Sequence, residues 1–176
     1  MATRTTAPPA TTDRSSRGIT APGLLLGIGL GGLVDGILLH QILQWHHMLT
    51  DYGGHASFPA TTVPSLEDNT LWDGLFHAGT WMCTLVGILL LWRAVSGGRH
   101  WGWRSLVGLM LAGWGLFNVV EGIVNHLILT VHHVRDDLGG PLAWDIGFLV
   151  FGALLVLAGT ALRGSDREGI AGLRRR

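Results

Sequence analysis

The chain has 176 residues, of which 48% are hydrophobic and only 14% are charged, with a formal net charge of zero. This balance is typical of a membrane protein rather than of a soluble domain. The arginines form no patch interleaved with aromatic residues, so we expect no nucleic acid among the partners. Because Cys83 is the single cysteine, an intramolecular disulfide is impossible.

Four apolar stretches reach the length of about 20 residues that a helix needs to cross a bilayer. In chain order, these spans are expected at about 23–49, 71–93, 104–133 and 141–163. The expected organisation is a disordered cytoplasmic tail over 1–22, a four-helix transmembrane domain over 23–163 and a basic cytoplasmic tail over 164–176.

The basic residues are distributed unevenly along the chain. All twelve are arginines. Eleven of them precede the first span, lie between the second and third spans or follow the fourth span, and only Arg135 lies on the other side. The positive-inside rule therefore predicts that both termini are cytoplasmic.

A histidine-rich motif in the first span recurs in the third span. The sequence DGILLHQILQWHHMLTD begins at Asp35, and EGIVNHLILTVHHVRDD begins at Glu121, a constant offset of 86 positions. Residues 25–51 are identical to residues 111–137 at 13 of 27 positions. An internal repeat of this kind indicates how the fold is built. We interpret the two matching segments as an internal duplication.

The second and fourth spans also begin alike, with WDGLF at residue 72 and WDIGF at residue 144. The repeating unit is thus a two-helix hairpin, with repeat halves at about 23–93 and 104–163. We expect an all-α integral membrane protein in which two duplicated hairpins form a bundle of four transmembrane helices.

Uninterrupted α-helices would arrange the polar residues of the repeat in layers. Asp35 would share a face with His46, and His40 would share another face with His47. The acids would lie deepest and the single histidines in the middle. The outer mouth would carry the histidine pairs, His46 with His47 and His132 with His133.

Ionisable residues inside a bilayer are costly and usually face the interior of a bundle. Imidazole and carboxylate ligands without paired cysteines suit Zn, Fe or Cu. We therefore predict an intramembrane transition-metal site near the extracytoplasmic face, where His40, His77 and His126 converge. Asp73, four residues before His77, and Asp145 would be ligands or would orient the imidazoles. The further candidates are the supporting acids Asp35 and Glu121 and, as a second outer site or an entry path, His46, His47, His132 and His133.

Three other interpretations remain open. His40 and His126 would suit bis-imidazole ligation of haem b, with the glycines of the first span making room for the porphyrin. Asp35 and Glu121 would suit a proton or metal-ion path. The histidine–aspartate pairs would also suit a structural or assembly protein in which they only hold the helices together. Small-residue pairs such as Gly27 and Gly31 favour helix packing over ligand binding.

The segments GLGGLVDGILLHQILQWHHML, WDGLFH and EGIVNH resemble a family of small bacterial four-span membrane proteins known only as a domain of unknown function. The resemblance covers roughly residues 22–163. It implies a multi-pass protein of the bacterial cytoplasmic (inner) membrane and brings no established activity. If the protein is an enzyme, metal-dependent redox or hydrolytic chemistry is the class to test. Expected partners are the lipid bilayer and a metal ion or haem; a homo-oligomer or a partner membrane protein is left open.

The predicted topology has a direct test. A reporter enzyme that is active only outside the cytoplasm should be inactive when fused after Arg176, because that terminus follows the arginine-rich end of the fourth span. The same reporter fused after Gly139, in the predicted outer loop, should be active. The opposite pattern would reverse the placement of the histidines.

Overall fold

The computed structural model describes residues 18–52, 58–98 and 101–173, with side chains described as far as Gly164. Most of the expected N-terminal tail, residues 1–17, and the end of the expected basic tail, residues 174–176, lie outside the described residues.

The described chain is helical and contains four segments long and apolar enough to cross a membrane. This confirms the all-α, four-span fold class. The elements are α2 (Thr20–Val34) continued by the π-helix η1 (Asp35–Ile42), α3 (Val63–Ser96), α4 (Trp103–Glu121) continued by the π-helix η2 (Gly122–Ile128), the short 3-10 helix η3 (Asp136–Leu138), and α5 (Leu142–Leu173).

The helix bounds differ from the expected spans most at four ends. Helix α3 begins at Val63, well before residue 71, with Pro64 in its first turn, where a missing N–H is tolerated. Helix α5 continues to Leu173 instead of ending near residue 163. The first and third spans end earlier than expected, at Ile42 and Ile128, because both change to π-helix and then leave helical conformation.

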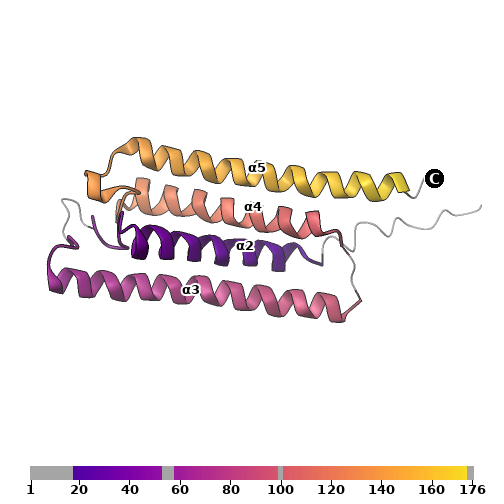
Figure 1. Cartoon of the computed structure of the whole chain (residues 1–176), viewed down its shortest axis with the longest axis horizontal. Helices are drawn as coiled ribbons and strands as arrows, with labels where there is room; N and C mark the ends of the chain where they lie inside the picture. The colour runs from indigo at the N-terminus through magenta and orange to yellow at the C-terminus, as the bar shows by residue number, and fades with distance from the viewer. Residues whose placement is uncertain (1–17, 53–57, 99–100, 174–176) are drawn as a thin grey trace, which may run out of the picture.

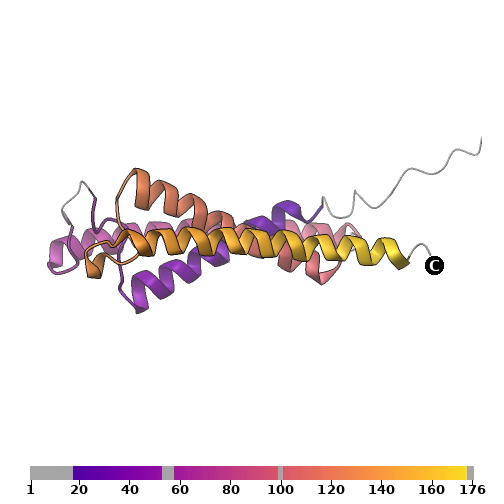
Figure 2. The same cartoon turned by 90° about the horizontal axis from the view of Figure 1, so that it is seen from above.

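The four long helices lie side by side in the order α5, α4, α2, α3 (Figure 1). The histidine-bearing helices α2 and α4 pack on each other in the centre, with α3 packed on α2 and α5 packed on α4. Seen from above, α2 and α4 cross and diverge toward the end at which the loops after η1 and η2 lie (Figure 2). The polar residues of both repeats are therefore carried to the same end of the molecule.

Glycines allow α2 and α4 to approach closely. A Cβ added to Gly27 would collide with the main-chain carbonyl of Met110, and one added to Gly113 would collide with the carbonyl of Leu24. A Cβ at Gly31 would meet the indole of Trp114. These contacts confirm that the glycines of the first span serve helix packing, as small residues do in membrane helices.

The close approach at Gly27 predicts a stability change with a matched control. Gly27→Ala should lower the free energy of unfolding by roughly 1–3 kcal/mol, because the added methyl group forces the two backbones apart. Gly79→Ala should be neutral or slightly stabilising, because nothing lies within 4 Å of the added Cβ and alanine favours helix. Thermal unfolding of both variants in detergent measures the difference. Equal effects of the two substitutions would contradict the packing role.

Candidate metal centre

Each π-helix places an acid beside a histidine five residues later. In η1, Nε2 of His40 lies 3.4 Å from Oδ2 of Asp35. In η2, Nε2 of His126 lies 3.1 Å from Oε1 of Glu121, the residue of α4 that directly precedes this π-helix. A π-helix brings residues i and i+5 together, whereas an α-helix turns them well apart. The four side chains are buried at the end of the bundle.

After each π-helix the chain reverses and brings a second histidine back to the first. The reversal passes through Gln44 (φ 52°) and Thr130 (φ 46°), equivalent positions of the two repeats, both in the left-handed region. The ring centroid of His46 consequently lies 4.4 Å from that of His40, and the centroid of His132 lies 4.9 Å from that of His126. The expected separation of His40 from His46, and of His126 from His132, into different layers is thus wrong, because the rings of each pair contact each other.

The two returning histidines also join the halves to each other. The rings of His46 and His132 stack with centroids 4.6 Å apart and an interplanar angle of 4°. Nδ1 of His46 lies 3.0 Å from the carbonyl oxygen of Val134, and Nδ1 of His132 lies 3.2 Å from that of Met48. Because a carbonyl oxygen only accepts, both Nδ1 atoms carry the proton and donate.

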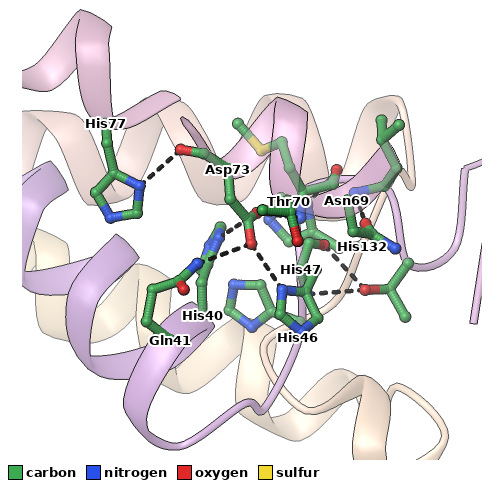
Figure 3. A network of polar contacts seen from close by, with 12 residues as sticks. His40, Gln41, His46, His47, Asn69, Thr70, Asp73, His77 and His132 are labelled. Carbon is green, nitrogen blue, oxygen red and sulfur yellow. Dashed lines mark hydrogen bonds and ion pairs between the residues drawn. The ribbon is translucent and has the colours of Figure 1, made fainter. Parts of the chain in front are cut away.

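Asp73 organises the groups around the first repeat. Its Oδ1 lies 2.9 Å from Nδ1 of His40 and accepts from the main-chain N–H of Met48 at 2.9 Å. Its Oδ2 lies 2.6 Å from Nδ1 of His47 and 3.1 Å from Nε2 of Gln41. Figure 3 shows the carboxylate surrounded by these side chains. All four oxygen contacts come from donors that reach it across the α2–α3 hairpin.

Asp145 has the equivalent place in the second repeat. Its Oδ2 lies 2.8 Å from Nδ1 of His133, and its Oδ1 accepts from the N–H of Val134 at 2.9 Å. Nδ1 of His126 lies 3.3 Å from the same Oδ1, an ion-pair contact. The two halves therefore repeat three of these contacts, and the contact from Gln41 has no counterpart because Leu127 occupies the equivalent position.

The interior of the cluster holds buried polar atoms without hydrogen-bond partners. These atoms are Nε2 of His40, Nε2 of His46, both ring nitrogens of His126 and Oε2 of Glu121. Two overlapping groups have ligand atoms within 4.8 Å of one another: His40, His46 and His132, and Glu121, His126 and His132. Burying unpaired polar atoms is costly. A metal ion would use these lone pairs.

Three predicted histidines and three predicted acids, Asp35, Asp73 and Asp145, lie outside those groups. His77 contacts the main-chain carbonyl of Asp73 through Nδ1 at 2.6 Å and lies against Gly36 of η1, facing away from the imidazole cluster (Figure 3). In the other half, Leu149 packs against Gly122 in the same way. His47 and His133 contact the far sides of Asp73 and Asp145, behind the cluster rather than in it.

Sequence reasoning missed several residues that support the cluster. Asn69 is buried and ties the loops to α3, since its Oδ1 accepts from Leu49 N–H and its Nδ2 donates to the carbonyl of Phe58. It lies one helical turn before Asp73 on the same face, which was a usable signal. Nδ2 of Asn125 lies 3.5 Å from Oε1 of Glu121. The main-chain carbonyls that orient His46 and His132 had no sequence signal.

Outside the spanning helices, the pKa of His46 lies well below its usual value because burial and the nearby imidazoles of His132 and His40 disfavour its charged form. His46 is therefore neutral, and with Nδ1 donating, its Nε2 keeps a lone pair. Burial also raises the pKa of Asp136 to about 6.

The fold and this cluster together define a multi-pass membrane protein with a buried group of histidines and carboxylates. Residues 22–166 match the DUF2243 family, described as a predicted membrane protein, and the chain belongs to that family. No curated protein and no solved structure matches the chain.

The Asp73 network predicts a large stability effect that is independent of any metal. Asp73→Ala should lower the free energy of unfolding by roughly 3 kcal/mol or more, because it leaves buried imidazole and main-chain donors unpaired. Asp68→Ala, an exposed acid five residues earlier on the same helix, should change it by less than about 0.5 kcal/mol. Both are measured by denaturant unfolding in detergent with a chelator present. Equal stabilities would contradict the role given to Asp73.

Proposed function

We propose that the protein binds transition-metal ions in a buried centre near the extracytoplasmic face of the bacterial inner membrane. The ligands are Nε2 of four histidines and the carboxylates of two acids: His40, His46, His126, His132, Asp35 and Glu121. Asp73 and Asp145 orient the imidazoles rather than bind the metal.

The observation that carries this proposal is the orientation of the four imidazoles. Each has Nδ1 facing an acceptor, either a buried aspartate or a main-chain carbonyl of the other half. A histidine whose Nδ1 donates to a carboxylate or carbonyl presents a basic Nε2, and metal-binding histidines are held in this way. Nε2 of His46 is buried without a hydrogen-bond partner, which a structural role alone does not require. The Nε2 atoms of the other three imidazoles face carboxylate oxygens of Asp35 or Glu121 at 2.9 to 3.4 Å, so the arrangement is that of a mixed imidazole–carboxylate site.

The ligand set supports up to two ions per chain. Each repeat supplies two imidazoles and one carboxylate: His40, His46 and Asp35 in the first, and His126, His132 and Glu121 in the second. Two histidines with one carboxylate form a ligand set used by non-haem iron and by zinc. Positions left open on such an ion would serve redox or hydrolytic chemistry, which is the reaction class proposed if the protein is an enzyme.

The geometry supports a metal ion more than a haem. The ring centroid of His46 lies 4.4 Å from that of His40 and 6.1 Å from that of His126. The ring centroid of His132 lies 5.9 Å from that of His40 and 4.9 Å from that of His126. A porphyrin ligated by His40 and His126 would have to displace this stacked pair. The glycines of α2 offer no alternative space, because neighbouring helices already contact them.

Metal content and the visible spectrum test the proposal together. Protein purified in mild detergent and reconstituted with Zn, Fe(II) or Cu(II) should retain one or two ions per chain and show no Soret band. His126→Ala and His132→Ala should lose at least half of the bound metal, since each removes a ligand of the Glu121 group. Elemental analysis by mass spectrometry measures the ratio.

His77→Leu is the matched control, because leucine occupies the equivalent position in the other half. It should keep the full metal content. A wild-type protein that is folded but retains none of the three metals would overturn the proposal, and a Soret band would favour the haem interpretation.

A further inference from the structure

A cavity of about 520 Å³ lies beside the metal centre, between the loop after η1 and the first turns of α3. Its wall includes three aromatic rings, Tyr52, Phe58 and Trp72, and one carboxylate, Asp68. Leu49 and Asn125 also line the cavity. An apolar cavity of this size with few polar groups is typical of a site for a small organic molecule.

The equivalent position in the other half contains a cation. At the offset of 86, Leu49 corresponds to Arg135, and at the offset of 72, Trp72 corresponds to Trp144. The guanidinium carbon of Arg135 lies 4.4 Å from the ring centroid of Trp45 and 5.0 Å from that of Trp144. Its Nε and Nη2 donate to the carboxylate of Asp137 at 2.7 and 2.8 Å.

The cavity arises where the repeats differ. Trp45 and Arg135 fill the space in one half, whereas the smaller Val131 and the uncharged Leu49 occupy those positions in the other. The cavity keeps the tryptophan, Trp72, and gains a carboxylate, because Asp68 corresponds to Gly140 at the offset of 72. Its lining thus combines aromatic rings and a carboxylate, the two kinds of partner that surround Arg135, without a basic side chain.

We propose that this cavity binds a small organic cation, an alkylammonium or guanidinium compound with an apolar part. The cationic group lies over Trp72 near Asp68, as the Arg135 guanidinium lies over Trp144 near Asp137, and the apolar part contacts Tyr52 and Phe58. Aromatic faces attract organic cations, most strongly where water is partly excluded. A nearby carboxylate adds to that attraction.

This site goes beyond the metal centre and does not depend on it. The two share a wall, because Asn125 lines the cavity and contacts Glu121, while Met48 lines it and its carbonyl accepts from His132. A bound cation therefore lies next to the groups that hold the Glu121 half of the cluster.

Calorimetric titration of the purified full chain in a non-ionic detergent tests the site. The probes are benzyltrimethylammonium and its neutral isostere neopentylbenzene. We expect saturable binding of the cation and at least about tenfold weaker binding of the neutral compound. Asp68→Asn and Trp72→Leu should each weaken binding of the cation by about tenfold, whereas Asp137→Asn, the acid of the filled half, should not change it.

Leu49→Arg supplies the cation from the chain itself and should abolish binding by filling the cavity as Arg135 fills its counterpart. Metal content, measured on the same preparations, should be unchanged in Leu49→Arg and Asp68→Asn, so that failure at this site is distinguishable from failure of the metal centre. The absence of saturable binding of the cation, equal binding of both probes, or unchanged binding in Leu49→Arg would overturn the proposal.

Discussion

A carboxylate buried at the end of a helix bundle must be surrounded by donors, and the pairing of Asp73 and Asp145 with imidazoles determines much of this structure. Each carboxylate accepts from a main-chain N–H in the segment after the preceding helix and contacts two histidines of its own half. The loops therefore fold back onto the helices instead of extending away from them. Because these contacts also fix the imidazole tautomers, the folding of the loops and the chemistry of the site have the same cause.

Backbone strain accompanies the site in both halves. The π-helices η1 and η2 and the left-handed residues Gln44 and Thr130 occupy equivalent positions in the two repeats. A left-handed non-glycine residue costs on the order of 1–3 kcal/mol, and π-turns are uncommon outside functional sites. The buried hydrogen bonds offset this strain. What the strain produces is the convergence of His40 with His46 and of His126 with His132, which an α-helix of the same sequence would not allow.

The two halves agree in the interior and differ at its edge. Their imidazoles, orienting aspartates and reversed loops match, whereas the surrounding positions have diverged. His77 of one repeat is equivalent to Leu149 of the other, and Leu49 is equivalent to Arg135. Matching ligands are required if both halves hold equivalent ions. The positions around the cluster do not need to match, because they supply no ligand. In one half the side chain of Arg135 fills the space beside the cluster, and in the other half that space is a cavity.

The sequence by itself determined the four apolar spans and the repeat, because bilayer length and side-chain polarity are local properties that composition and spacing record. Among its candidates were the histidines and acids that converge, together with His47, His77 and His133, which do not join them. The sequence also indicated that the first-span glycines pack helices. Tertiary structure decided how the histidines meet. The five-residue spacing of Asp35 and His40 aligns only in a π-helix, and His46 returns only because the chain reverses at Gln44. Both features are stabilised by partners distant in sequence. The sequence named Asp73 as a ligand or orienting acid but not the imidazoles that it contacts, and no local pattern reveals the carbonyl of Val134.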